Sequence, residues 1–406
     1  MSLTGPGPNK ARSILIAHPG SELYGSDRVT LASAEYLIER GWRVTVTVPL
    51  RGPLCDALEA VGATVVVLRF PVLRKSAMTP TGAAALLRNC LAAFVPAVRL
   101  IRRVRPSVVY VATVTLPFWI LVGRLCRVRV LCHLHEAEVG AHPVLRKVLA
   151  APTVLANGVI ANSRFTLGSL KAELPRTRFN EFVIRNPISP PTSPSARPRS
   201  SLDPPVRILF VGRLSPRKGP QIAIEALSTL VSGGIDCQLS LLGAVYEGYE
   251  WFETDLRSQI KDLDLEERVT FLGFHQDVWP FLDGCDITVV PSLDPEGFGN
   301  TAVEAVMAQR PIVTVDSGGL VEAVEGFACA VLTAPGSAPH LAAAIKTIAD
   351  QWDDFASHAV ADARVATARH STESYRDALQ RAVQVTLGVT TKDLHHDNNT
   401  SATGSD

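Results

Sequence analysis

The chain has 406 residues, and 47% of them are hydrophobic, which is enough apolar material for two full cores, so two domains are expected. Its seven cysteines are scattered and include no Cys-x-x-Cys pair, which excludes a disulfide framework and indicates buried thiols in a reducing compartment. Residues 1–12 contain no apolar segment of the kind found in secretory signals, so we expect a cytoplasmic protein.

The formal net charge of +1 hides a strong asymmetry. Residues 1–200 hold 26 Lys and Arg against 10 Asp and Glu, whereas residues 201–406 hold 14 against 29. Such a division suggests that the basic half meets an anionic partner. Nucleic acid is not expected, because no binding motif is present and aromatic residues are few. An anionic membrane surface fits better, and simple solubility from solvated charge is the alternative.

Strands and helices alternate from the start of the chain. Residues 13–17 read as a buried strand, residues 29–40 as a helix and residues 44–48 as a second strand. The loop before the helix contains Gly25, which lets backbone approach a ligand closely. The loop lacks the G-x-G-x-x-G pattern of a dinucleotide site.

The next segments are more apolar. Residues 81–104 predict a helical stretch interrupted near Pro96. Its end, residues 98–105, alternates apolar and basic side chains, which suits a membrane-surface helix and equally an ordinary surface helix. The apolar run 107–123 is shorter than the roughly 20 residues that cross a bilayer, and it divides into a strand at 108–111 and a helix at 117–126. No membrane span is predicted.

Residues 128–132 predict a strand that ends at His133 and His135, whose side chains share one face. A metal site with Cys132 is the alternative, but no further spaced Cys or His set completes it, so no metal is predicted.

Residues 188–205 are rich in Pro, Ser and Arg and predict a linker between domains. The first domain is expected to cover 13–187 together with a crossover helix near 372–387. The second is expected to cover 206–371, and residues 388–406 to form a disordered tail.

The second domain opens with a predicted strand at 206–211 and a basic loop, 212–219 (GRLSPRKG). A basic loop between a strand and a helix suits phosphate, because Arg213 can make a two-pronged contact and Lys218 supplies a point charge. A solvated basic turn is the alternative.

A further strand, 287–290, leads into a loop and a helix that Asn300 or Thr301 is expected to cap and that is expected to run to about Gln309. The helix start favours an anion. Glu296 in the loop and Glu304 in the first helical turn, with seven residues between them, suit a polyhydroxylated ligand. A capping Glu beside a solvated loop Glu is the alternative. The sheet is expected to finish after Thr314.

Several stretches together carry a specific resemblance. They are 133–136 (HLHE), 158–163 (GVIANS), 183–187 (VIRNP), 212–219 (GRLSPRKG), 269–275 (VTFLGFH), 286–292 (DITVVPS), 304–308 (EAVMA) and 317–322 (SGGLVE). The chain resembles the retaining GT-B glycosyltransferases of family 4 (glycosyltransferase group 1), which carry an E-x7-E signature, from about Ile14 to Tyr375. It departs from their pattern at three places: one glycine of a pair is lost beside Gly25, Trp42 replaces a His, and Pro187 replaces a Gly.

The resemblance implies two facing Rossmann-like domains with the active site in an interdomain cleft. It implies retaining transfer of a sugar from a nucleotide diphosphate sugar to a hydroxyl acceptor, without metal or cofactor. The acceptor would be lipid-linked or a growing cell-surface glycan, at the inner face of the membrane. A nucleotide-sugar epimerase or hydrolase of the same fold and a non-catalytic binding subunit are the alternatives.

The resemblance also implies roles for individual residues. Arg213 and Lys218 would neutralise the leaving diphosphate, Glu296 would bind the donor sugar, and Glu304 would bind the ribose. His135 would lie beside the anomeric carbon. The remaining donor-binding residues implied by the resemblance are Gly25, Phe274, His275, Phe298, Gly299, Asn300 and Thr301.

Overall fold

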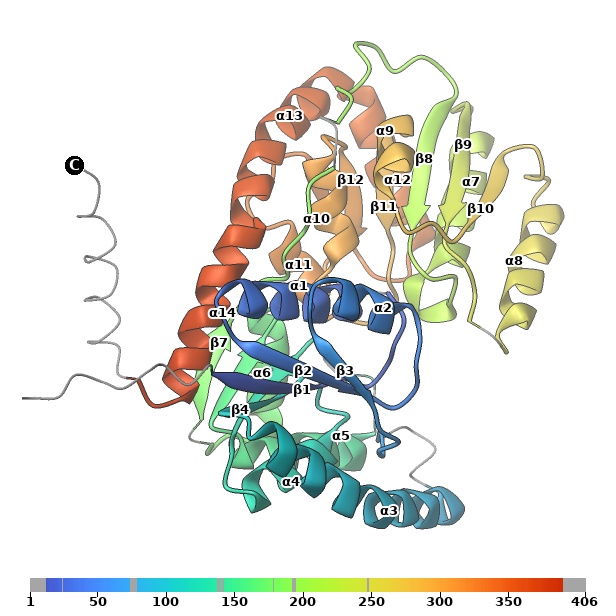
Figure 1. Ribbon diagram of the computed structural model, residues 1–406. Helices are drawn as coiled ribbons and strands as arrows, with labels where there is room; N and C mark the ends of the chain where they lie inside the picture. The colour runs from blue at the N-terminus through green and yellow to red at the C-terminus, as the bar shows by residue number, and fades with distance from the viewer. Residues whose placement is uncertain are drawn as a thin grey trace, which may run out of the picture. The chain divides into compact units, whose positions relative to one another are not determined.

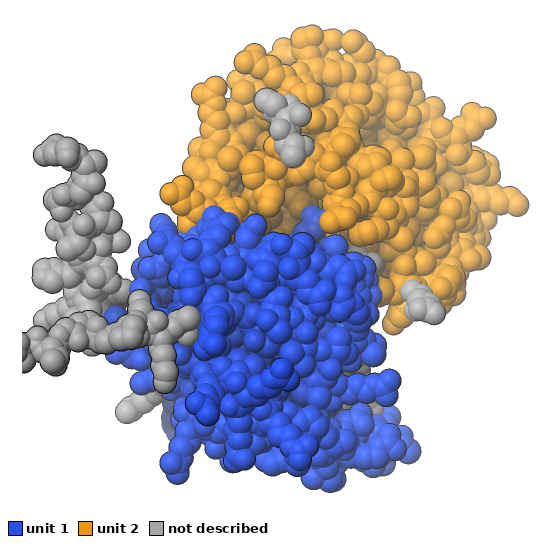
Figure 2. Space-filling model, in the orientation of Figure 1, with its two compact units in different colours: residues 1–185, 375–406 blue, residues 186–374 orange. Residues whose placement is uncertain are grey.

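The computed structural model describes residues 12–23, 25–73, 79–136, 140, 142–177, 179–191, 195–246 and 248–389. Its internal contacts divide the chain into two compact units, residues 1–185 with 375–406 and residues 186–374 (Figures 1 and 2). The predicted tail falls almost wholly outside the described residues. Each unit is an α/β structure built on a parallel sheet, and each is described here by itself.

The sheet of the first unit has seven strands in the order β3-β2-β1-β4-β5-β6-β7, all parallel. The strand order reverses between β1 and β4, where Ile14 pairs with Val108. Parallel sheets of this kind bind ligands beyond the carboxyl ends of the strands at such a reversal. The strands are β1 (Ser13–Ala17), β2 (Arg43–Val48), β3 (Thr64–Val67), β4 (Val108–Val111), β5 (Arg129–Leu134), β6 (Gly158–Ala161) and β7 (Asn180–Val183).

Helices cover both faces of this sheet, because alternate residues of each strand point to opposite sides. Ile14 and Ile16 face a core shared with α1, α2 and α14, whereas Leu15 and Ala17 face a core shared with α3, α4, α5 and α6 (Figure 1). The helices are α1 (Gly25–Glu39), α2 (Pro53–Ala60), α3 (Pro80–Val104), α4 (Pro117–Leu125), α5 (Pro143–Ala150), η2 (Ala151–Leu155), α6 (Arg164–Glu173) and α14 (Thr372–Thr386).

The second unit repeats this plan with six parallel strands in the order β10-β9-β8-β11-β12-β13. Its strand order reverses between β8 and β11. The strands are β8 (Val206–Val211), β9 (Cys237–Leu242), β10 (Val269–Gly273), β11 (Ile287–Val290), β12 (Ile312–Val315) and β13 (Ala330–Thr333).

Helices α7, α8 and α12 pack with one face of the second sheet, and α10, α11 and α13 contribute to the core on the other. The helices of this unit are η3 (Pro216–Lys218), α7 (Pro220–Ser232), α8 (Glu250–Asp262), α9 (Trp279–Gly284), α10 (Asn300–Met307), α11 (Gly319–Ala323), α12 (Ala338–Asp350) and α13 (Trp352–Arg369).

The predictions for the last strand and for helix α3 were wrong. The sheet does not finish after Thr314, because β13 pairs with β12 and adds an edge strand. Helix α3 is not interrupted at Pro96 but runs through it. A proline within a helix removes one hydrogen bond, and burial of Ala93, Ala97 and Ile101 against the core stabilises the helix around it.

The apolar run at 107–123 divides into β4 and the start of α4, as predicted. Among the described residues, α3 alone is long and apolar enough to pass as a membrane-crossing helix by length and composition, and 22% of its most apolar window is buried. Segment 188–205 has no helix or strand among its described positions. Arg199 in this segment forms an ion pair with Asp286 of the second unit at 2.5 Å.

Candidate active site

Two loops meet at the carboxyl edge of the second sheet, one after β8 and one after β11. The left-handed φ of 77° at Gly219 and its closeness to Pro291 allow only glycine, because a Cβ atom there would lie 2.1 Å from the Pro291 carbonyl oxygen. The backbone N–H of Leu293 donates to the Arg217 carbonyl at 2.8 Å. The basic loop and the Glu296 loop are therefore held together by backbone contacts.

An ion pair between a half-buried lysine and a buried carboxylate joins the same two loops. The Nζ atom of Lys218 lies 2.7 Å from Oε1 of Glu296, and the Ser292 hydroxyl donates to that oxygen as well. Burial alone would raise the pKa of Glu296, but the positive charge and hydrogen bond of Lys218, assisted by Ser292, outweigh burial and hold this pKa below its usual value. Glu296 is thus ionised and fixed in direction, and Ser292 is a site residue that the sequence analysis missed.

Two glycines of the stretch 317–322 support the Glu296 loop from behind. The N–H of Gly319 donates to the Glu296 carbonyl at 2.7 Å. A Cβ at Gly319 would lie 2.2 Å from the Gly297 carbonyl oxygen, and one at Gly318 would lie 2.7 Å from the Glu296 carbonyl oxygen. The start of α11 therefore sets the backbone position of the carboxylate residue.

Helix α10 follows this loop, but its cap differs from the prediction. Gly299, with φ 120°, is the N-cap, and the helix runs from Asn300 to Met307. Neither Asn300 nor Thr301 caps it, because both already lie within the helix, and Oδ1 of Asn300 accepts a hydrogen bond from Asn186 at 2.8 Å instead. Glu304 is consequently in the second helical turn and not in the first.

Arg213 is held in place by an aromatic side chain. Its guanidinium lies over the ring of Tyr246, 3.5 Å from the ring centroid. The backbone at Gly243 lies close to the backbone at Gly212, and only glycine permits this approach, because a Cβ atom at Gly243 would lie 1.9 Å from the Gly212 carbonyl oxygen. The stacked guanidinium keeps its charge while its direction is fixed. Tyr246 has no motif around it that would have revealed its role from sequence.

The other donor-side residues differ in exposure. Phe298 is only 2% exposed, and its ring centroid lies 5.5 Å from that of His370, so its side chain belongs to the core and only its backbone is suited to a ligand. Phe274 is exposed, and His275 bonds through Nε2 to the Leu272 carbonyl at 3.1 Å. These two residues lie in the loop after β10.

Taken by itself, the first unit has a cluster of histidines at the carboxyl ends of β1 and β5, in which His18 and His133 are fully buried and the ring nitrogens of His135 are buried. His135 follows β5, and its ring centroid lies 4.0 Å from that of His133. His133 Nδ1 is hydrogen-bonded to the Tyr110 hydroxyl. His18, which follows β1, lies 3.3 Å from a carboxylate oxygen of Asp27 in the first turn of α1. Gly25 begins that helix.

Burial keeps these rings neutral. It lowers the pKa of His135 to about 3, with the charge of His18 adding to the effect. It lowers the pKa of His133 well below its usual value, and it lowers the pKa of His18 despite the attraction of Asp27. Within the described part of the chain, neither ring nitrogen of His135 has a hydrogen-bond partner. A buried ring with two unused nitrogens is suited to a polar ligand or water.

The carbonyl of His135 is already engaged, since it accepts a hydrogen bond from Asn162 Nδ2 at 2.9 Å. No group of three or more His, Cys, Asp or Glu residues that could hold a metal ion occurs across the described ranges. The sequence analysis missed His18 and Asp27. Their only signal was that His18 immediately follows a buried strand.

Comparison with known proteins assigns the family. The model of the glycosyltransferase family 4 domain matches residues 24–190, and the model of the group 1 glycosyl transferases matches residues 195–364. The chain belongs to the family 4, group 1 glycosyltransferases. The family membership predicted from the sequence is confirmed.

Two curated relatives illustrate the match. The amylovoran biosynthesis glycosyltransferase AmsK of Erwinia amylovora is 34% identical over 152 residues, 36% of each chain. The 2-deoxystreptamine glucosyltransferase of Streptomyces kanamyceticus is 29% identical over 143 residues, 35% of each chain. The similarity therefore spans about a third of the length of these relatives.

Solved glycosyltransferase structures match over much more of the chain. Anabaena HepE in complex with UDP-glucose superposes with a TM-score of 0.77 at 24% identity, covering 92% of this chain and 99% of that one. The lipopolysaccharide outer core galactosyltransferase WaaB has a TM-score of 0.68 at 15% identity, covering 92% and 99%. The predicted GT-B fold class is confirmed. The interdomain cleft stays a prediction.

Proposed function

We propose that this protein transfers a sugar from a nucleotide diphosphate sugar to a hydroxyl acceptor. The observation that carries the proposal is the ion pair of Lys218 and Glu296, at the strand-order reversal where sheets of this class bind ligands. The pair places a fixed cation and a fixed anion side by side. A sugar diphosphate offers the two matching groups, an anionic leaving group and hydroxyl donors.

The roles are proposed from the family pattern and are consistent with the chemistry of each side chain. Lys218 and Arg213 stabilise the negative charge that develops on the leaving diphosphate, which is often the largest single contribution to catalysis. Glu296 accepts hydrogen bonds from hydroxyls of the donor sugar, and Glu304 accepts them from the ribose. Backbone N–H groups at Gly299, Asn300 and Thr301 add donors at the start of α10.

The histidine cluster serves the acceptor side in this proposal. His135 is proposed to lie beside the reacting carbon through its ring, whose nitrogens are buried without a partner in the described part of the chain, or through its carbonyl, which accepts one hydrogen bond from Asn162. Gly25 begins α1, whose first turn holds Asp27, the partner of His18 in this cluster. Retention of configuration and independence of metal are proposed from the family pattern.

A nucleotide-sugar hydrolase or epimerase is the second candidate, since the same donor site would serve it. A hydrolase or epimerase would consume the donor when no acceptor is present, whereas a glycosyltransferase would not. A subunit that only binds the donor is disfavoured, because Arg213, Lys218, Glu296 and Glu304 are all present.

The acceptor is proposed to be a lipid-linked or surface glycan, reached on an anionic, inner membrane face. Between Glu59 and Glu136 the sequence has no acidic residue but eleven Lys and Arg. On α3 the side chains of Leu87, Leu91 and Phe94 are 61%, 70% and 40% exposed. Exposed apolar groups among basic ones suit a membrane interface.

The residues that carry this apolar surface differ from those predicted. Leu100 and Ile101, which the sequence pattern paired with the arginines, are buried against the core. The exposed apolar residues lie about two to four turns earlier on the same helix. The arginines Arg99, Arg102, Arg103 and Arg105 are exposed, as their pattern indicated.

The experiment is a thermal-shift panel of nucleotide sugars, beginning with UDP-glucose because HepE was solved with it. A donor at about 100 times its Kd should raise the Tm by roughly 5–10 °C for units of this size. The same donor should then be consumed only when an acceptor is present. Absence of a shift with every nucleotide sugar, in a folded protein, would refute the proposal.

A further inference from the structure

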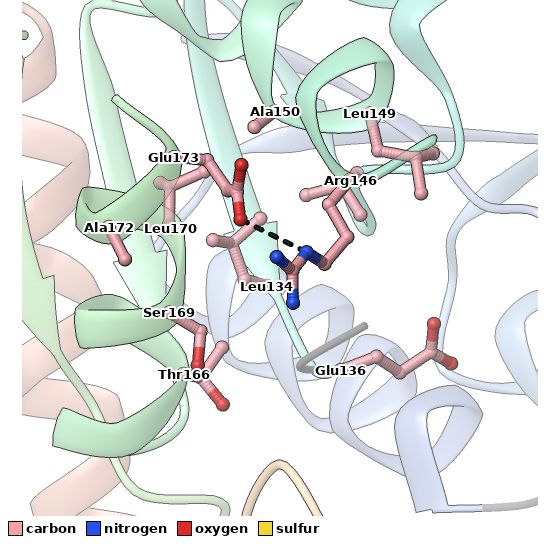
Figure 3. A pocket seen from close by; sticks show the side chains of 11 residues that line it. Leu134, Glu136, Arg146, Leu149, Ala150, Thr166, Ser169, Leu170, Ala172 and Glu173 are labelled. Carbon is pink, nitrogen blue, oxygen red and sulfur yellow. Dashed lines mark ion pairs between the residues drawn. The ribbon is translucent and has the colours of Figure 1, made fainter. Parts of the chain in front are cut away.

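A cavity of about 200 Å³ opens between α5 and α6 in the first unit (Figure 3). Its wall is largely apolar, and Leu134, at the end of β5, lies behind it. The apolar residues that line it are Val114, Leu134, Leu149, Ala150, Leu170 and Ala172. No residue of the donor site or of the histidine cluster belongs to this wall.

Polar side chains are present in the same wall. Arg146 of α5 and Glu173 of α6 form an ion pair at 3.0 Å across the gap between the two helices (Figure 3). Thr166 and Ser169 lie one turn apart on α6, and Glu136 follows the end of β5 beside His135. The cavity therefore combines an apolar interior with polar groups that can form hydrogen bonds with the polar headgroup of an amphiphile.

We propose that this cavity binds the hydrocarbon chain of an amphiphilic acceptor, with the acceptor hydroxyls directed to the Glu136 side, next to His135. This proposal rests on the proposed function, whose acceptor it specifies. A hydrocarbon chain suits this wall because moving the apolar surface of the chain and of the wall out of water is favourable. The chain has no polar groups that would lose hydrogen bonds to water on entering the cavity. A free sugar acceptor would gain little from such a wall.

The surroundings of the cavity favour a chain that comes from a membrane. Helix α5 turns Val144 and Val148 outward, both about half exposed, while its Leu149 and Ala150 line the cavity. Helix η2, which directly follows α5 and packs against α4, exposes Val154 and Leu155. Helix α5 thus carries exposed apolar groups as well as part of the cavity wall, and η2 adds further exposed apolar groups directly after it in the chain.

Charge supports the same occupant. The first half of the chain has a balance of +16 from its 26 basic and 10 acidic residues. A lipid whose headgroups lie in an anionic surface would therefore be attracted to this half. The chain of that lipid needs only to pass from the exposed side of α5 into the cavity beside it.

The test measures binding of methyl, hexyl, octyl and decyl glucosides by calorimetry, below the concentrations at which they form micelles. The sugar head is constant, so differences report the chain alone. Affinity should rise about fourfold for each added methylene until the cavity is filled, and then level off. Equal affinity for methyl and decyl glucoside would overturn the proposal.

A pair of variants on α6 tests the location. Ser169→Phe fills the cavity from its wall and should abolish the dependence on chain length. Gly168→Phe is the matched control, because Gly168 does not line the cavity and a Cβ atom there meets nothing within 4 Å, so the dependence should remain. If Ser169→Phe does not fold, Ala172→Phe, at an exposed position of the wall, replaces it.

A filled cavity that leaves the chain-length dependence unchanged would refute the assignment to this site. A separate measurement shows whether a negative result concerns the cavity or the proposed glycosyltransferase function. Nucleotide-sugar binding, measured by thermal shift, involves the second unit and should be the same in wild type, Ser169→Phe and Gly168→Phe. Loss of alkyl glucoside binding with intact donor binding therefore concerns the cavity alone.

Discussion

Nζ of Lys218 and Oε1 of Glu296 lie 2.7 Å apart, so that the loop after β8 and the loop after β11 share one ion pair. Removing Lys218 leaves the buried Glu296 carboxylate uncompensated, which is destabilising, whereas Lys218 is 22% exposed and water can still reach its charge if Glu296 is removed. The pair therefore fixes two loops that are distant in sequence before any ligand arrives. That arrangement is suited to catalysis, because the charges need no reorganisation during the reaction.

The first prediction concerns the cations of this site. Lys218→Ala and Arg213→Ala should each lower kcat/KM at least about 100-fold, the scale expected when one electrostatic donor is lost. Lys261→Ala removes a positive charge from an exposed position on α8, outside this site, and should stay close to wild type. The measurement is steady-state kinetics with the donor found in the thermal-shift panel. Near-normal turnover in both site variants would contradict the assignment.

The second prediction concerns Gly219. Gly219→Ala forces a Cβ atom to within 2.1 Å of the Pro291 carbonyl and should separate the two loops. Gly234→Ala is a matched control, because Gly234 has a similar φ of 82° but nothing within 4 Å of its Cβ position. The control should lose about 1–2 kcal/mol from left-handed strain alone, and Gly219→Ala clearly more. Urea unfolding followed by circular dichroism distinguishes the two, and equal losses would show that the contact with Pro291 is unimportant.

Most strands could be predicted from sequence because they are buried on both faces and read as short apolar runs. The segment 287–290 illustrates this, since the structure gives β11 the same bounds. The edge strand β13 was missed because it is partly exposed and its apolar run is short. The cap of α10 was misplaced because the Asn300 side chain bonds to Asn186, a contact that no local pattern contains.

The site was predictable only where motifs were contiguous. Lys218 and Glu296 each lie in a recognisable stretch, although their direct contact is not visible in the sequence. The pairing of His18 with Asp27 depends on how a strand end meets a helix start, and Tyr246 reaches Arg213 from another loop. Such contacts are set by the tertiary fold, so single-sequence reasoning has no signal for them.

The third prediction is metal independence. Arg213 and Lys218 supply the positive charge that a divalent cation would otherwise bring to the diphosphate. Activity should therefore be unchanged in excess EDTA, measured with the established donor and acceptor. Loss of activity that Mg²⁺ or Mn²⁺ restores would contradict the proposed role of the two side chains.

The fourth prediction concerns pH. His135 has a pKa lowered to about 3 in the folded protein, whereas an unfolded histidine titrates near pH 6.5. Below about pH 6.5 the unfolded chain binds the proton and the folded protein does not, so stability falls as the pH drops from about 6.5 towards 3. One such histidine costs about 2 kcal/mol at pH 5. NMR of the ring Cε1 resonance, assigned with His135→Asn, should show no titration above pH 5, and a midpoint near 6.5 would contradict the burial.

The fifth prediction concerns membrane binding, measured by co-sedimentation with anionic and neutral vesicles. Wild type should bind the anionic vesicles preferentially, and changing the four arginines of α3 and its C-cap to Gln should weaken this binding. About 1 kcal/mol for each basic residue near the surface gives about 4 kcal/mol, or roughly a thousandfold in partitioning. The preference should fade with salt, because the Debye length falls from about 10 Å at 0.1 M to about 3 Å at 1 M. The four arginines are Arg99, Arg102, Arg103 and Arg105.

Two further variants distinguish the contribution of the α3 arginines to vesicle binding from that of net charge and from that of exposed apolar side chains. A control with the same loss of charge, all at exposed positions of the second unit, should bind like wild type; it carries Gln at Arg217, Arg257, Lys261 and Arg364. Changing the exposed Leu87, Leu91 and Phe94 to Ser keeps every charge but should weaken binding that survives at high salt, since apolar insertion is not screened. Equal binding to both vesicle types, or a control that loses as much as the α3 variant, would leave the basic half of the chain as a solvated surface only.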